Sequence, residues 1–183
     1  MYSIHATKKL LDRVKQPVEQ PVSRPTTVLG NWYANAVFLK PQLVLLVNER
    51  TLFPVVMPLA PASTVMKRFP DSLRDILEAR AIPAEFIEFE TAAMAEGRYA
   101  KTNSKSILGV MNDFVYSLKW RHDGRGITDP LWLGLDLSQT PSGPLRDRHG
   151  APDRELDAVV TSWLTKRVPR ESPNGAKHLQ PRG

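Results

Sequence analysis

The chain has 183 residues, of which 42% are hydrophobic and 24% charged, and its formal net charge is +6. These fractions are typical of one folded domain and exclude a collagen-like, coiled-coil or wholly disordered chain. The lack of cysteine excludes a disulfide framework, a thiolate zinc site, an iron–sulfur cluster and a cysteine nucleophile. Because no apolar run approaches the ~18 residues of a membrane helix, we expect a cytoplasmic protein with no membrane partner.

The chain begins with a short strand and a short helix. Alternating apolar residues predict a strand over residues 1–5, and Thr7 can cap a helix that ends at Val14. Three prolines follow between residues 16 and 25. Since each proline removes a backbone donor and favours extended neighbours, this segment is predicted to be a connecting loop.

Strands are predicted most strongly in the next part of the chain. Three runs rich in β-branched and aromatic residues cover residues 32–39, 43–47 and 52–57. Their connections are so short that neighbouring strands must be antiparallel. The second run has no polar residue, which predicts a central strand covered on both faces. Pro54 places the third strand at an edge or a bulge of the sheet.

Helical spacing of apolar residues replaces the strand pattern after residue 58. A helix is predicted from Ser63 or Thr64 to Arg80, and Pro70 is expected to break or kink it. A second helix is predicted over residues 84–96 and ends at Gly97. A polar segment leads into the strongest helical pattern, which is formed by Ile107, Met111, Phe114 and Leu118. Two glycines, Gly124 and Gly126, form a loop after it. Short helices are expected after residue 129 and over residues 152–164.

These elements predict a single α+β domain over residues 1–165, with a small antiparallel sheet of three to four strands packed against several helices. Residues 166–183 contain five basic residues and one acidic residue, and their prolines and polar residues have nothing to bury. We therefore expect a basic disordered tail. Such a tail can contact nucleic acid weakly by releasing counterions, or it can simply aid solubility.

Common catalytic signatures are missing. The four histidines, His5, His122, His149 and His178, do not stand at the spacing that places two metal ligands on one helix face, and we expect each to be an ordinary surface residue. The chain has no phosphate-binding loop, dinucleotide fingerprint or nucleophile elbow. These absences disfavour a standard hydrolase or a nucleotide-driven enzyme, and we expect no metal and no cofactor.

Two small polar clusters accompany the predicted strands. Trp32, Tyr33 and Asn35 join aromatic rings to an amide, which could stack and read a base, or could belong to the core and a local backbone contact. Asn48, Glu49 and Arg50 lie where two hydrophobic strands meet. They could form a site at a strand end, or they could serve the turn and solubility.

A third cluster precedes and enters the strongest helix, and consists of Lys101, Thr102, Asn103, Lys105, Ser106, Asn112 and Asp113. Side-chain donors beside a helix N-terminus favour an anion. Helical spacing places Asn112 on one face with Lys105, Tyr116 and Lys119, opposite the apolar stripe. The alternative is an N-cap by Asn103 or Ser104 followed by a solvated helix face.

Several runs also stand in a fixed order: Thr7-Lys8-Lys9-Leu10-Leu11, Trp32-Tyr33-Ala34-Asn35, Val44-Leu45-Leu46-Val47-Asn48-Glu49-Arg50-Thr51, Lys101-Thr102 with Ser106, Leu108-Gly109, Met111-Asn112-Asp113-Phe114, and Thr140-Pro141 with Gly143-Pro144-Leu145. Together they resemble a small bacterial domain family of unknown function that also occurs attached to plasmid-type open-reading-frame proteins. The resemblance covers residues 1–164 and implies a fold and a bacterial cytosolic setting, but no activity. Ser104 and Lys105 stand where the family usually has Asn and Arg, so an arginine-dependent role does not carry over.

We therefore favour a non-catalytic binding or accessory module of a bacterial cell, which could take a protein partner. Its candidate surface comprises the strand ends and residues 101–113. The alternative is an enzyme acting on nucleic acid or a nucleotide, with Lys101, Asn112 and Asp113 as polar site residues. A toxin–antitoxin or mobile-element context would suit either function.

Overall fold

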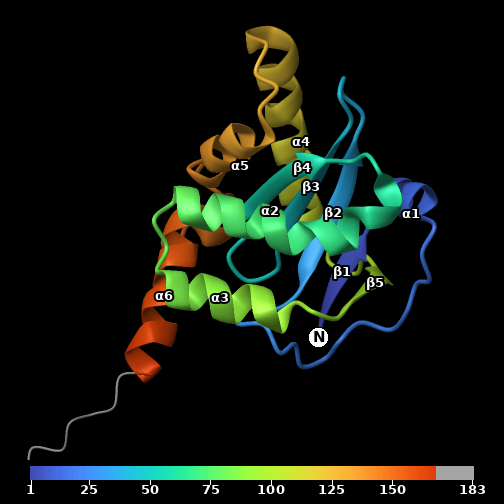
Figure 1. Ribbon diagram of the computed structural model, residues 1–183. Coiled ribbons are helices and arrows are strands. Elements are labelled where there is room, and N and C mark those ends of the chain that lie inside the picture. The colour runs from blue at the N-terminus through green and yellow to red at the C-terminus, as the bar shows by residue number, and fades with distance from the viewer. Residues whose placement is uncertain (168–183) are drawn as a thin grey trace, which may run out of the picture.

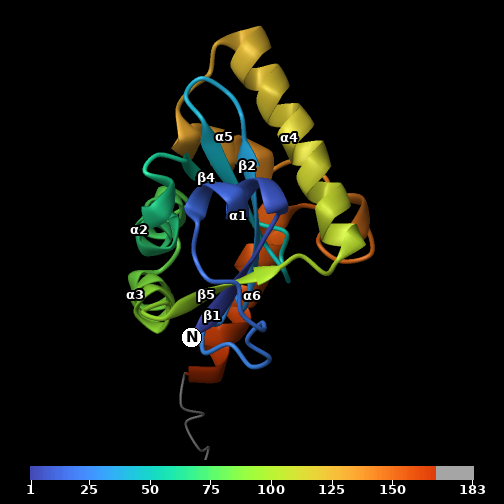
Figure 2. The same cartoon turned by 90° about the vertical axis from the view of Figure 1, so that its right-hand side faces the viewer.

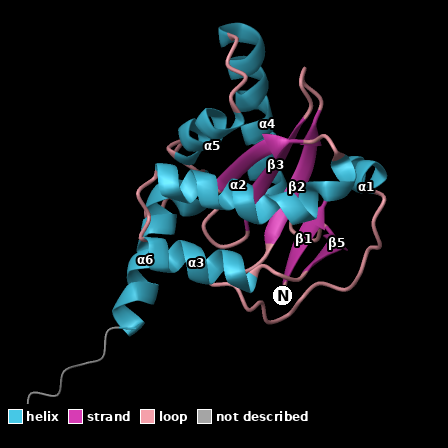
Figure 3. Ribbon diagram, viewed as in Figure 1, coloured by secondary structure: helices cyan, strands magenta, loops and turns pink. Residues whose placement is uncertain are grey.

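A five-stranded sheet with helices on both faces organises the chain, and its strands stand in the order β4–β3–β2–β1–β5 (Figure 1). The computed structural model describes residues 1–167. The strands are β1 (Tyr2–Ala6), β2 (Trp32–Val37), β3 (Leu43–Asn48), β4 (Pro54–Pro58) and β5 (Gly97–Lys101). The α-helices are α1 (Lys8–Val14), α2 (Val65–Ala79), α3 (Ala84–Ala93), α4 (Lys105–Arg125), α5 (Pro130–Ser138) and α6 (Pro152–Arg167) (Figure 3).

The sheet is mixed, which corrects part of the sequence prediction. As predicted, β2, β3 and β4 are antiparallel neighbours, and β4 with Pro54 lies at an edge of the sheet. However, β1 pairs in parallel with both β2 and β5. The α+β class of a single domain is confirmed, whereas an antiparallel sheet of three to four strands is wrong in both strand number and direction.

The strand that sequence reasoning missed is β5. Its sequence contains one glycine and two charged residues, so no apolar alternation marks it. Gly97, predicted to end a helix, begins this strand instead, and the helix before it ends at Ala93. The strand forms because β1 offers it a full parallel partner, from Tyr2 opposite Gly97 to Ala6 opposite Lys101.

The two faces of the sheet carry two separate cores. On the face we call the α2 face, the strands pack against α1, α2, α3 and α6 around Trp32 and Phe69. On the opposite face, which we call the α4 face, they pack against α4 and α5 around Leu45 and Phe114. Figure 2 shows the strands between α2 and α3 on one side and α4 on the other. All six residues of β3 are buried, which confirms that this strand is covered on both faces.

Several helix boundaries differ from the prediction for local reasons. Pro70 lies inside α2 and does not end it, because the apolar stripe on both sides packs into the α2-face core. Helix α4 is capped by Ser104, whose Oγ accepts from the Ile107 amide at 3.3 Å, and it continues through Gly124 to Arg125. Phe114 is buried within its stripe. Within residues 1–167 no helix combines the length and the apolar character needed to cross a membrane.

The predicted basic tail begins at Lys166, and its first two residues complete α6. The remainder of that prediction, residues 168–183, lies outside the described residues.

Candidate functional site

Polar side chains gather at the end of the sheet that is formed by the carboxyl ends of the parallel strands β1 and β5. Ala6 and Lys101 are paired in register, and Ala6 is also paired with Ala34 of β2. Helix α1 follows β1 and packs on the α2 face, while α4 follows β5 and packs on the α4 face. When two parallel strands send their helices to opposite faces, their carboxyl ends are where ligands bind in many α/β sheets.

A cleft of about 720 Å³ lies at this edge, and we call it the edge cleft. One wall is a proline-containing segment, residues 16–21, which we call the strap. The other wall is the end of β5 and the segment after it. The residues lining the cleft are Val18, Glu19, Gln20, Pro21, Lys101, Thr102 and Asn103.

Backbone and side-chain contacts hold the strap against β5. The Glu19 amide donates to the Tyr99 carbonyl oxygen at 2.8 Å, and Val18 forms one parallel bridge with the same residue. The Glu19 carboxylate lies 3.4 Å from the Arg98 guanidinium. Farther along the chain, the Val22 amide donates to Ser3 Oγ at 2.7 Å. Contacts within the strap and just after it therefore hold this wall of the cleft against β5 and β1.

Buried polar side chains fix the other wall. The rings of His5 and Tyr33 stack with centroids 4.6 Å apart. His5 Nδ1 lies 3.0 Å from the Lys101 carbonyl oxygen, and since that oxygen can only accept, Nδ1 carries the proton. The Tyr33 hydroxyl donates to Asn103 Oδ1. Burial, together with the negative charge of Glu49, raises the pKa of Tyr33 against the opposing effect of Asn103, so the hydroxyl stays a donor.

The structure brings together only part of the predicted 101–113 surface. Lys101 and Thr102 line the edge cleft, but Lys105 and Ser106 lie beyond it, exposed in the first turn of α4. Asn112 and Asp113 are exposed farther along the helix, and seven residues of α-helix separate Lys105 from Asn112 by about 10 Å. Lys101 therefore lies at the edge cleft, whereas Asn112 and Asp113 lie outside it on α4.

The Trp32–Asn35 cluster is divided between the core and the same edge. Trp32 is fully buried and meets the ring of Phe69 edge-on at 4.9 Å, so it is not open to a base. Asn35 Oδ1 accepts from Thr7 Oγ1 at 2.7 Å, which joins β2 to the residue before α1. This contact lies at the carboxyl edge, next to the residues that shape the cleft.

Asn48 is the last residue of β3, lies opposite the first residue of β2 at the other end of the strands from the cleft, and is fully buried. Its Oδ1 accepts from the amides of Arg50 and Thr51 at 3.1 and 3.0 Å and from Thr51 Oγ1 at 3.0 Å. Its Nδ2 donates to the carbonyl oxygens of Leu29 and Asn31 at 2.9 and 3.3 Å. All the hydrogen-bonding capacity of this amide is used to hold the β3–β4 turn against the segment before β2. We call this arrangement the Asn48 hub.

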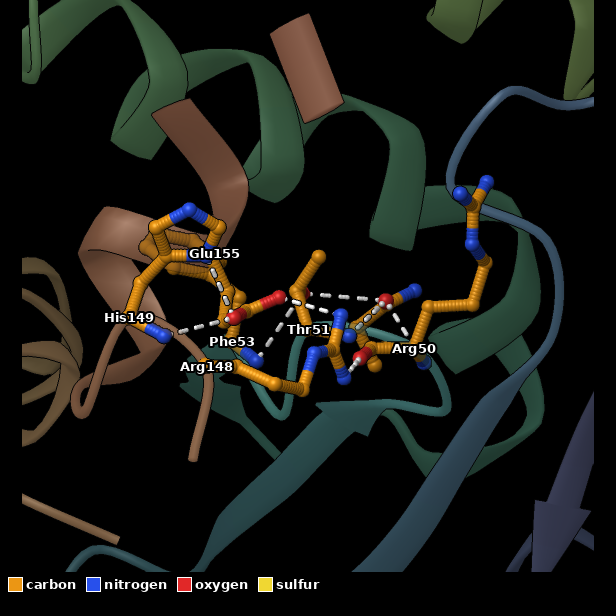
Figure 4. A network of polar contacts seen from close by, with 7 residues as sticks. Arg50, Thr51, Phe53, Arg148, His149 and Glu155 are labelled. Carbon is orange, nitrogen blue, oxygen red and sulfur yellow. Dashed lines mark hydrogen bonds and ion pairs between the residues drawn. The ribbon is translucent and has the colours of Figure 1, made fainter. Parts of the chain in front are cut away.

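Arg50 connects this hub to the C-terminal helix, as Figure 4 shows. Its carbonyl oxygen accepts from Arg148 Nη1 at 3.1 Å, and Arg148 also forms an ion pair with Glu155, which is buried. Glu155 further accepts from the His149 amide at 3.1 Å. These groups line a cavity of about 230 Å³, but the buried carboxylate is already paired with Arg148, so this network ties α6 to the β3–β4 turn. The third member of the predicted turn cluster, Glu49, is exposed.

Sequence reasoning missed several residues beside the cleft, among them His5, Thr7 and Glu19, and it grouped Tyr33 only with Trp32 and Asn35. The prediction of His5 as a surface residue is wrong, because it is only 2% exposed. His5 and Tyr33 meet only through the parallel pairing of β1 with β2, which has no local signal. Glu19 lies in a proline-rich loop whose path the sequence does not determine. Among residues 1–167, no group of His, Asp and Glu side chains is arranged to hold a metal ion.

The comparisons with known proteins give one match. A family model described as a domain of unknown function, DUF6933, matches residues 3–155. Apart from Tyr2, the first residue of β1, the matched range contains all five strands, the edge cleft and the Asn48 hub. The chain therefore belongs to the DUF6933 family. No curated protein and no solved structure matches it.

Proposed function

We propose that this member of the DUF6933 family is a non-catalytic binding module, and that the edge cleft binds a small polar anion. One observation carries the proposal. Lys101 lines a cleft of about 720 Å³ at the carboxyl end of β5, and its ammonium group has no ion-pair partner within residues 1–167. An unpaired cation beside the hydroxyl of Thr102 and the amide of Asn103 suits an anionic ligand that also accepts hydrogen bonds.

The charges around the cleft favour the same class of ligand. Glu19 is the acidic residue of the lining, and Arg98 balances it at 3.4 Å. This leaves the charge of Lys101 available to a ligand. Gln20 on the strap offers a further amide donor from the opposite wall. A ligand with several oxygen atoms, such as a phosphate or a carboxylate, could contact both walls.

The cleft wall is also preorganised. The His5 contact fixes the Lys101 carbonyl group, and the Tyr33 hydroxyl fixes Asn103. Both aromatic rings are buried, so their positions are set by the sheet. A site whose donors are already held loses less conformational freedom when a ligand binds.

The biological setting is part of this proposal. The resemblance noted in the sequence supports a bacterial protein associated with plasmid-type open-reading-frame proteins. The lack of cysteine fits a reducing cytosol. Both are inferences that gene neighbourhood and cell fractionation can test.

Native mass spectrometry of the purified protein, followed by calorimetric titration with inorganic phosphate, tests the proposal. We expect either a retained anion or saturable phosphate binding, and a loss of at least tenfold in affinity in Lys101→Met. Lys119→Met removes an exposed lysine of α4 that does not line the cleft and is the matched control, with unchanged affinity. Equal binding by all three proteins, or no binding by the wild type, would refute the anion site.

A further inference from the structure

Basic residues gather at the end of the sheet where the strands β1, β2 and β5 finish. The carboxyl ends of these three strands lie together, because β1 is parallel to both β2 and β5. The segments that follow the strands are residues 7–19, 38–42 and 101–106, and we call them together the basic sheet end. They contain seven basic residues and two acidic ones. This end of the sheet therefore carries a clear excess of positive charge.

Both acidic residues of the basic sheet end are already paired with cations. Asp12 lies 2.7 Å from the Lys8 ammonium group, and Glu19 lies 3.4 Å from the Arg98 guanidinium. In contrast, Lys9, Arg13 and Lys101 are exposed and have no ion-pair partner within residues 1–167. Uncompensated cations on one surface attract a ligand that carries several negative charges.

The unpaired cations follow one another across the surface. Ala6 and Lys101 are neighbours in the sheet, and α1 begins two residues after Ala6. Lys9 and Arg13 stand one helical turn apart on the same side of α1. In Figures 1 and 2, α1 lies between the tip of the β2–β3 hairpin and the end of β5. The cations therefore lead from the edge cleft along α1 toward the hairpin.

An exposed aromatic ring stands at the far end of this path. Phe38 follows β2 and is 48% exposed. The Arg13 guanidinium carbon lies 5.1 Å from the centre of its ring. Nucleic-acid bases stack on aromatic rings and on guanidinium planes, and this requires bases that are not already stacked in a duplex. Cations beside an exposed ring are typical of surfaces that bind single strands.

We propose that the basic sheet end binds single-stranded nucleic acid, with phosphate groups on Lys101, Lys9 and Arg13 and a base stacked against Phe38. The inference rests on the proposed anion site, because one phosphate of the strand occupies the edge cleft. An acidic protein or an anionic membrane would use the charge of this surface, but neither would need the exposed ring. The ring therefore favours the single strand.

Fluorescence anisotropy of a labelled oligothymidylate of about ten nucleotides, titrated with the full chain at several salt concentrations, tests the proposal. We expect saturable binding, and three phosphate contacts predict a slope of about −2 for the logarithm of affinity against the logarithm of salt concentration. The double variant Lys9→Met with Arg13→Met should lose at least tenfold in affinity and most of this slope. Lys119→Met, an exposed lysine of α4 outside the basic sheet end, is the matched control and should change neither.

The stacked base is tested separately. Phe38→Ala should weaken oligothymidylate binding by about tenfold without changing the salt slope, whereas Phe38→Trp should retain the affinity. A duplex of the same length should bind at least tenfold more weakly than the single strand. Equal affinity for both, or tighter binding to phosphatidylserine vesicles than to the oligonucleotide, would overturn the proposal.

The same variants separate this inference from the anion site. Equal oligonucleotide affinity in the wild type and the Lys9–Arg13 double variant would overturn the basic sheet end as the binding surface. Lys101-dependent binding of inorganic phosphate without any oligonucleotide binding would overturn this inference alone. Oligonucleotide binding that depends on Lys9 and Arg13 but not on Lys101 would support the surface and contradict the site in the cleft.

Discussion

The Asn48 hub and the edge cleft lie at opposite ends of the strands of the same sheet, and both are rich in polar residues. At the hub, one buried amide makes five hydrogen bonds, and each of them holds a turn or a neighbouring segment. At the cleft, Lys101 has no ion pair within residues 1–167, and nearby side chains serve to hold its wall. A polar cluster is therefore a candidate ligand site when some of its hydrogen-bond donors are not used by the folded chain itself.

The largest effect should come from the core beneath α4. Phe114→Ala truncates a buried aromatic residue that packs on the α4 face, and we expect it to lower the free energy of unfolding by ~3–5 kcal/mol. Urea denaturation followed by circular dichroism measures this loss. Because α4 begins next to the cleft wall, phosphate affinity should fall as well. A loss of unfolding free energy below about 1 kcal/mol would mean that Phe114 does not pack against the sheet.

Asn48→Ala should be the most damaging change at the hub itself. It leaves the amides of Arg50 and Thr51 without their acceptor in a buried turn, so we expect a loss of at least ~2 kcal/mol. Asn112→Ala is the matched control, since this exposed asparagine should change stability by no more than ~0.5 kcal/mol. Similar losses of stability in the two variants would contradict the view that Asn48 supports the fold and Asn112 does not.

The pH dependence of stability sharpens the same comparison. Glu90 is fully buried and accepts from the Val28 and Leu29 amides beside the hub. Burial raises the pKa of Glu90 to about 7, although these amides and Arg50 oppose the shift. A carboxyl whose pKa is raised in the folded state stabilises the fold while protonated, so stability should decline as pH rises from about 4.5 to about 7. The decline is on the order of 3 kcal/mol.

The difference between wild type and Glu90→Gln isolates this contribution. Chemical denaturation at several pH values should show the decline in the wild type and lose most of it in the variant, because glutamine does not titrate. Parallel curves for the two proteins would contradict the assigned pKa.

The smallest effect on stability is expected at the cleft. Lys101→Met removes an exposed charge that supports no other described group, so the free energy of unfolding should change by no more than ~0.5 kcal/mol. Thermal and urea melts check this. A loss above 1 kcal/mol would place Lys101 with the structural residues and against a ligand role.

Local patterns predicted those parts of the fold that are made locally. The hairpin strands over residues 32–57, the edge position of Pro54 and the buried stripe of α4 all follow from spacing and short turns. β5 was missed because its residues become a strand only beside β1. The same limit applied to the parallel direction of β1, since a parallel pair is set by the crossover between the strands.

The candidate site was predicted in the same uneven way. Lys101 and Thr102 stood out because they precede a helix with a clear N-cap pattern. Asn48 stood out too, but its sequence does not reveal that all its hydrogen bonds are used inside the fold. His5 and the strap were not accessible from sequence, because their place at the cleft depends on contacts between distant segments.

The position at which phosphate binds distinguishes the edge cleft from the Asn48 hub. Two-dimensional ¹H–¹⁵N NMR spectra of the full chain, recorded during titration with inorganic phosphate, report on each backbone amide separately. An anion site at the edge cleft predicts saturable shifts of the amide signals of Thr102 and Asn103. These shifts should be absent in Lys101→Met, and the amide signals of Arg50 and Thr51 should not move. Saturable shifts confined to Arg50, Arg148 and their neighbours, or no saturable shift at all, would contradict it.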